Sequence, residues 1–240
     1  MKRILIYACV MTVLSISQLQ KSYALECLAS PPNSPNGCET PGSIECIYGL
    51  TNSVRGCPIN RTTAKSNGGW GAIAVVEVLH NKCIQNDLNI FSRQFGLAST
   101  TITYIYPPSA PSSSPLSSGC QNLLPPLNTP PDSCENHPTA TEKNPCNEHV
   151  LDVEWSHAMA PNARIIVVEA RSGSISDKMY AVCYAALAVE QAGGGLVSMS
   201  FSDPEFSGET NYDRYFQSHP HVVFIAVSYT HLTLPTIYSV

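Results

Sequence analysis

The amino-acid sequence predicts an α/β protein: a parallel sheet with helices on both faces. Four short, nearly continuous apolar segments have the pattern of strands that are buried on both faces. Segments with apolar residues three and four positions apart, typical of helices, lie between them. Such a succession along the chain is the order of a parallel α/β sheet. The predicted strands are 72–76, 164–169, 196–201 and 222–226, and the predicted helices are 87–95, 148–160 and 176–192.

Each predicted helix ends at a residue that cannot continue it. The first carries Leu88, Phe91 and Phe95 on one face and stops at Gly96. The second stops at Pro161, whose ring and missing N–H break a helix. The third is rich in alanine and ends at three consecutive glycines, 193–195.

The first 24 residues have the three parts of a secretory signal peptide. A basic start at Lys2 and Arg3 precedes an apolar run over 4–16, and a small-residue pattern predicts cleavage after Ala24. A membrane anchor is the alternative, but the run is shorter than the roughly 20 residues of a membrane span. We therefore expect a secreted or periplasmic protein, without stable membrane insertion after cleavage.

Export makes disulfides the expected use of the cysteines. Of ten cysteines, Cys9 lies in the predicted signal, which leaves nine. An odd number predicts a free thiol or a missing partner, and we expect that the partner lies in sequence beyond this chain. No C-x-x-C pair occurs, which disfavours metal and thioredoxin-like readings.

Composition divides the mature chain and limits its partners. Residues 25–68 are rich in Cys and Pro and predict an irregular entry segment, and 69–226 predict one domain with a disulfide-stapled surface excursion at 107–146. The net charge is −5, with 13% charged residues and no basic run. This argues against a nucleic-acid partner, and we expect a monomer.

Glu148 and Asp152 are the candidate catalytic groups. Four residues apart on a helix, the two carboxylates lie on one face about one turn apart. Two such acids do not ionise independently, so one retains its proton to higher pH and can act as base and acid in turn on a serine hydroxyl. The same spacing is common on solvated helix faces, so the surrounding sequence must decide whether the pair is catalytic.

Four stretches, in order, resemble the sedolisin family of serine-carboxyl peptidases. The helix at 148–163 has the pattern E-x-x-L-D followed by a Pro-terminated turn, and 87–97 reads D-L-x-x-F-x-x-x-F-G-L after the first strand. Residues 165–177 match a strand ending in V-E-A with its S-x-S-D turn, and 197–210 match the substrate-lining strand and the next loop. The resemblance covers about residues 45–226.

The resemblance implies a subtilisin-like fold, C-terminally truncated here, and a Ser-Glu-Asp triad. Glu148 would be the general base and Asp152 would orient and tune it. Ser198, Met199 and Ser200 would offer main-chain hydrogen bonds to an extended polypeptide substrate. No cofactor is visible in the sequence, and the calcium site that the family implies would lie in the missing C-terminal part.

The chain departs from the family at several positions. Glu77 stands where relatives often have Asp, and Ser202 stands where they often have Gly. The Gly-Asp turn and the Gly-Thr-Ser nucleophile are absent, and 227–240 look like translated sequencing adapter. We therefore expect an endopeptidase fragment that is inactive as written.

Several other polar residues fit structural roles better than functional ones. His149 and His157 fit ordinary partly buried histidines better than a metal site, and Ser198 and Ser200 lie in no G-x-S-x-G elbow. The acids 203, 205, 209 and 213 fit a solvated turn better than a calcium loop. The alternative function is a non-catalytic secreted relative that binds peptides or glycans, which has no need of the Glu148 and Asp152 pair.

Overall fold

The computed structural model describes residues 39–51, 57, 67–112, 116, 119–134 and 145–226. The chain has an α/β fold with a five-stranded, all-parallel sheet in the order β2-β3-β1-β4-β5. Two compact units make up the chain, one holding the sheet and the other holding helices α2, α3 and α4. The predicted signal peptide and residues 227–240 lie outside the described residues.

The sheet is centred on β1 (Ala72–Val78), which pairs with β3 (Arg164–Ala170) on one side and β4 (Gly195–Met199) on the other. The edges are β2 (Thr103–Ile105) and β5 (Val222–Ala226). Six residues of β1 and six of β3 are buried without alternation. This confirms that their continuous apolar runs come from strands buried on both faces.

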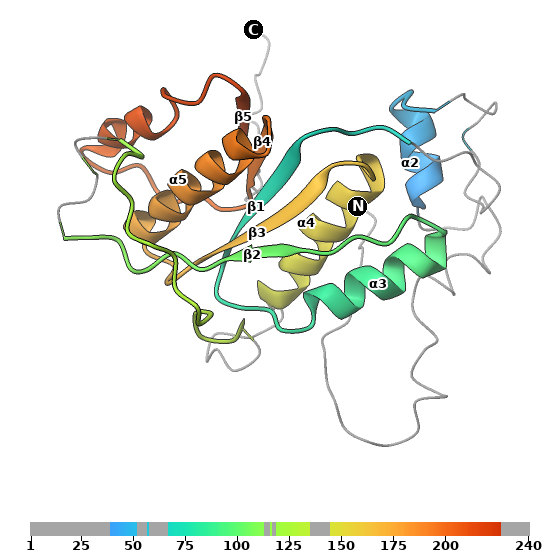
Figure 1. Cartoon of the computed structure of the whole chain (residues 1–240), viewed down its shortest axis with the longest axis horizontal. Coiled ribbons are helices and arrows are strands. Elements are labelled where there is room, and N and C mark those ends of the chain that lie inside the picture. The colour runs from blue at the N-terminus through green and yellow to red at the C-terminus, as the bar shows by residue number, and fades with distance from the viewer. Residues whose placement is uncertain are drawn as a thin grey trace, which may run out of the picture. The chain divides into compact units, whose positions relative to one another are not determined.

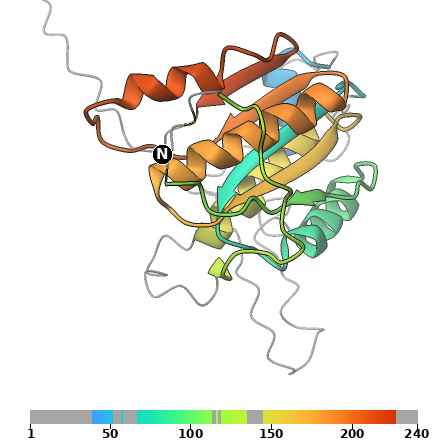
Figure 2. The ribbon, with the colours of Figure 1, turned by 60° about the vertical axis from the view of Figure 1, so that its left-hand side comes forward.

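Helix α5 (Ile175–Gln191) packs along one face of the sheet, as Figures 1 and 2 show. Its small side chains allow a close approach to the strands, and the two elements share one hydrophobic core. Tyr212 and Tyr215, from the 3₁₀ helix η2 (Glu209–Tyr215), extend that core. The fully buried residues of α5 are Tyr180, Ala181, Val182, Cys183, Ala185, Ala186 and Val189.

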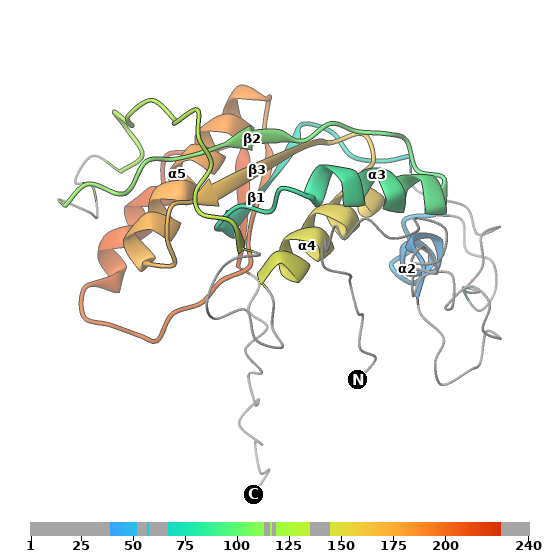
Figure 3. The same cartoon turned by 90° about the horizontal axis from the view of Figure 1, so that it is seen from below.

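In the other unit, α3 (Ile84–Phe95) packs against α4 (Pro145–Met159), and Figure 3 shows the two helices side by side. Leu88 and Val153 are fully buried. The rings of Phe91 and Trp155 meet edge-on, with 6.2 Å between their centres. Helix α3 ends at Gly96 in the left-handed conformation, as predicted. It begins earlier than predicted because Asn81 Oδ1 accepts a hydrogen bond from the Cys83 N–H at 2.9 Å and so starts the first turn.

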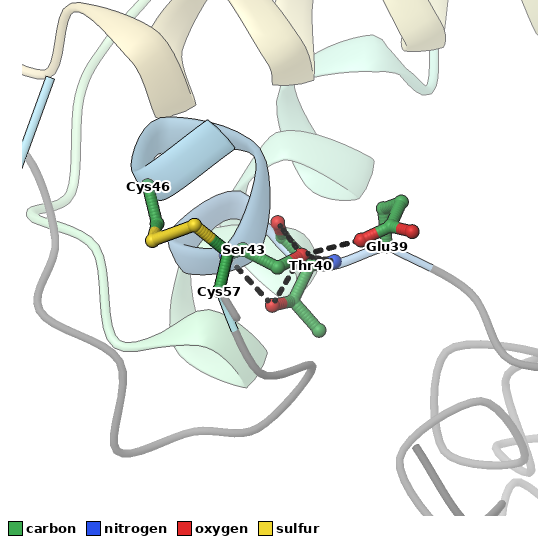
Figure 4. Close-up of a disulfide and its surroundings, with 5 residues drawn as sticks. All are labelled: Glu39, Thr40, Ser43, Cys46 and Cys57. Atoms are coloured by element: carbon green, nitrogen blue, oxygen red, sulfur yellow. Dashed lines mark hydrogen bonds between the residues drawn. A yellow bond between two sulfur atoms is a disulfide. The ribbon is translucent and has the colours of Figure 1, made fainter. Parts of the chain in front are cut away.

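The predicted entry segment contains a short helix, α2 (Pro41–Ile47), where an irregular structure was expected. Thr40 and Ser43 form a capping box, and Pro41 supplies the restricted φ angle favoured at a helix start. The Cys46–Cys57 disulfide joins the end of α2 to the following segment (Figure 4).

Two further disulfides join Cys120 to Cys183 and Cys134 to Cys146. The first attaches the chain at Cys120 to α5, and the second attaches Cys134 to the first turn of α4. All seven described cysteines are disulfide-bonded. Cys27 and Cys38 lie outside the described residues.

Glycines permit the closest backbone contact in the sheet unit. Gly71, just before β1, and Gly195, the first residue of β4, have φ angles of +64° and +143°. A Cβ on Gly71 would collide with the main chain of Gly194, and a Cβ on Gly195 would collide with the main chain of Ala72. The Ala72 N–H donates to the Gly194 carbonyl at 3.0 Å across this contact. The contact sets the register at which β4 enters the sheet beside β1.

We expect Gly195→Ala to lower the free energy of unfolding by more than about 3 kcal/mol, because strain at positive φ adds to a backbone clash. Gly193→Ala is the matched control: its φ is +96°, but nothing lies within 4 Å of the added Cβ, so only strain of about 1–2 kcal/mol is expected. Urea unfolding measures both. Equal losses in the two variants would contradict the proposed contact.

Candidate active site

Helix α4 carries both predicted catalytic carboxylates. It ends at Met159, two residues before Pro161, as the sequence predicts. Glu148 lies in its first turn and Asp152 one turn later, and both side chains are partly buried. The structure therefore brings these two predicted residues together on one helix.

Glu148 is held in a poorly solvated position. Its Oε1 is buried and has no hydrogen-bond partner among the described residues. Burial, and secondly the charge of Asp152, raise the pKa of Glu148 from 4.5 to about 7. A carboxylate in this state is a stronger base than an ordinary one and still releases its proton near neutral pH.

The predicted substrate-binding residues occupy β4 and its end, in the sheet unit. Ser198 pairs with Val75 and Ile225, and Met199 pairs with Val76 and Ala226, so both lie inside the sheet with ladders on either side. Ser200 is the first residue beyond both ladders.

Both histidines of α4 are more deeply buried than expected. His149 is 2% exposed and His157 is fully buried. His157 Nε2 lies 2.7 Å from the Ala98 carbonyl oxygen, a contact in which the ring N–H must donate. His157 therefore ties α4 to the segment after α3.

Sequence reasoning missed a second acidic pair, formed by Asp87 of α3 and Glu154 of α4. Glu154 is 8% exposed, and burial followed by the Asp87 charge raises its pKa to about 9. Burial raises the pKa of Asp87 to about 6. The two acids lie 67 positions apart, so only the packing of α3 on α4 could reveal the pair.

A histidine–glutamate pair at the carboxyl ends of β1 and β3 was also missed. His80 Nδ1 lies 2.8 Å from Oε2 of Glu169, which is fully buried, and the rings of Tyr104 and Tyr106 stand edge-on to His80. Glu169 is also the ladder neighbour of Glu77, which is 4% exposed. The apolar run that contains Glu169 gave no signal for this contact.

The remaining polar candidates are at the surface. Ser202 is exposed, as are the acids 203, 205, 209 and 213. Among the described residues, no group of three or more His, Cys, Asp or Glu side chains could hold a metal ion.

Comparisons with protein-family models, with curated proteins and with solved structures returned no match to this chain. The narrowest structural class to which this chain can be assigned is therefore an α/β fold with a parallel sheet. Within the described residues, no helix has the length and apolar character needed to cross a membrane. The three disulfides that join two described cysteines are typical of an oxidising compartment outside the cytosol.

We expect Asp152→Asn to lower the pKa of Glu148 from about 7 toward 4.5, because the substitution removes a like charge. Burial remains, so the pKa stays above 4.5. Carboxyl ¹³C titration by NMR, with Glu148→Gln to assign the signal, measures the change. Asp87→Asn is the control: it should lower the pKa of Glu154 and leave that of Glu148 in place, and the reverse pattern would contradict both assignments.

Glu154→Gln should make the protein more stable at alkaline pH. The folded chain holds the Glu154 proton up to about pH 9, whereas the unfolded chain releases it near 4.5, so this side chain's contribution to stability falls as pH rises between those values. Urea unfolding at pH 5 and pH 8 should show that Glu154→Gln reduces the loss of stability between the two. The exposed Glu205→Gln is the control, and an unchanged pH dependence in Glu154→Gln would refute the burial argument.

Proposed function

We propose that this chain is the N-terminal part of an exported serine-type endopeptidase in which Glu148 is the general base and Asp152 tunes it. The observation that carries the proposal is the state of Glu148: a partly buried carboxylate, one oxygen of which lacks a described hydrogen-bond partner, with a pKa of about 7 raised by burial and by Asp152. The nucleophilic serine would come from sequence after Ala226.

The chemistry needs a base that changes its protonation state during the reaction. Glu148 would accept the serine proton as the hydroxyl oxygen attacks the peptide carbonyl, and would return it to the leaving amine. The Asp152 charge favours this step, because a nearby negative charge stabilises the protonated form of Glu148 over the ionised form. Asp152 thus acts through Glu148 and touches no substrate atom.

The position of the carboxyl end of β4 supports an extended polypeptide as the substrate. Ligands of parallel α/β sheets bind beyond the carboxyl ends of the strands, where Ser200 lies. An extended polypeptide bound there would lie beside the chain that follows β4. The disulfides support a secreted or periplasmic location.

The first test is to read the source gene across the codon for Ala226 in one long read. A frame that continues through a Gly-Asp turn to Gly-Thr-Ser would support the peptidase. Genuine DNA that encodes 227–240 and then a stop codon would exclude it, and the non-catalytic relative that binds peptides or glycans would replace it.

In the completed protein, we expect Glu148→Gln to lower kcat/KM by about 10²- to 10⁴-fold, the usual contribution of a general base. Cleavage of a quenched fluorescent peptide mixture measures the change. Glu154→Gln is the matched control on the same helix and should retain cleavage. A Glu148→Gln protein as active as the parent would disprove the assigned role.

A further inference from the structure

The chain makes a strained turn between β1 and His80. Leu79 is buried and has a φ angle of +71°, a left-handed conformation that costs a residue other than glycine about 1–2 kcal/mol. Glu169 is the ladder partner of Glu77, so in a regular strand the side chain of His80, three positions on, would point to the opposite face. The turn at Leu79 directs His80 to Glu169 instead. Strained backbone of this kind is concentrated at functional sites.

Glu169 fixes the tautomer of the His80 ring. Nδ1 of His80 lies 2.8 Å from Oε2 and 3.0 Å from Oε1 of a carboxyl group that has no exposed surface. An ionised carboxylate can only accept hydrogen bonds, so Nδ1 carries the ring proton and Nε2 of the neutral ring does not. His80 is therefore a base at Nε2, and the carboxylate stabilises the imidazolium that forms when this base takes up a proton.

The segment 127–133 crosses the carboxyl ends of three strands in the order that they have in the sheet. After β2, the Leu127 N–H donates to the Tyr106 carbonyl at 2.7 Å. After β3, the Arg171 guanidinium donates to two main-chain carbonyls, at 3.3 Å to residue 129 and at 2.8 Å to residue 130. These contacts hold the main chain of the segment as it approaches β1.

The end of this segment pairs with His80. The His80 N–H donates to the Asp132 carbonyl at 2.9 Å, and Ser133 forms a parallel β-bridge with His80. Residues paired in a parallel bridge place their side chains on the same side of the two chains. The hydroxyl of Ser133 and the imidazole of His80 therefore project in the same direction, and both residues are partly exposed.

We propose that Ser133, His80 and Glu169 form a serine hydrolase site for small uncharged esters. Ser133 is the nucleophile, His80 is the general base, and Glu169 is a positioning residue that holds the ring. All three belong to the sheet unit, whereas Glu148 and Asp152 belong to the other unit. The inference does not rest on the proposed function, because the endopeptidase would use a different serine and a different base.

The reaction is acyl transfer through a covalent intermediate. Oγ of Ser133 attacks the ester carbonyl carbon while Nε2 of His80 takes the hydroxyl proton. The bond to the leaving oxygen then breaks, and His80 gives the proton to that oxygen, which releases the alcohol and leaves an acyl group on Ser133. Water, activated by His80 in the same way, hydrolyses the acyl group to the carboxylic acid and restores the serine.

The surroundings of His80 favour an uncharged aromatic ester. The rings of Tyr104 and Tyr106 stand edge-on to the imidazole, with ring centres 6.3 Å and 6.0 Å away, and stack on each other. Such rings can pack against an aryl group of the ester. Burial, followed by the charge of Glu169, raises the pKa of both tyrosines, so the same charge would repel an anionic ester.

The test treats the full chain with a fluorophosphonate that carries a fluorescein group, because an activated serine displaces fluoride from phosphorus and keeps the label. We expect peptide mapping to locate the label at Ser133, and we expect the chain to hydrolyse p-nitrophenyl acetate. Ser133→Ala should abolish both, and His80→Gln should slow labelling by about 10²- to 10⁴-fold. Thr129→Ala is the matched control: it removes a hydroxyl from the same segment, keeps the carbonyl that Arg171 contacts, and should change neither.

Three results would overturn the proposal: no label on the folded parent, a label at another residue, or labelling of Ser133 that is equally fast in His80→Gln. If His80→Gln fails to fold, carbethoxylation of His80 in the folded parent replaces it. Labelling should then stop and return after hydroxylamine removes the modification, and labelling that persists contradicts the role of His80. Because the endopeptidase would take its serine from sequence after Ala226, no outcome of this test bears on that function.

Discussion

The packing of α5 on β1, β3 and β4 is the constraint on which the sheet unit depends. Fully buried alanines let the helix approach the strands closely, and the Cys120–Cys183 disulfide attaches the long excursion to the same helix. Two α5 hydroxyls then fix the excursion further: Tyr180 accepts a hydrogen bond from the Leu124 N–H, and Tyr184 donates one to the Leu124 carbonyl. Because these contacts converge on one helix, displacing α5 would disturb the core and the loops together.

The main elements could be predicted because each has a strong local signal. The strand 222–226 was predicted with its observed bounds, since its apolar run is sharply limited. Strand β2, with three residues, is too short for a periodic signal and is defined by its pairing with β3. Helix α2 was missed although Thr40, Pro41 and Ser43 carry a helix-start signature, because the cysteines and prolines around it suggested irregular structure.

The candidate site also combines features that local sequence can predict with features that depend on tertiary packing. The proximity of Glu148 and Asp152 follows from helical spacing alone, whereas the burial that raises the pKa of Glu148 follows from tertiary packing. The sequence also could not place β4 between β1 and β5, since strand order is a property of the whole sheet.

The proton retained by Glu154 affects how Glu148 can work. Helix α4 carries three acids within seven positions, 148, 152 and 154, and full ionisation would place three negative charges on it. Because burial and Asp87 keep Glu154 protonated until about pH 9, Asp152 is, of the other two acids of α4, the one that adds a negative charge near Glu148 at neutral pH. A third charge would raise the pKa of Glu148 further and leave less of it ionised. Glu154, buried between two helices, thus helps to keep Glu148 in the range where a carboxylate can both take up and release a proton.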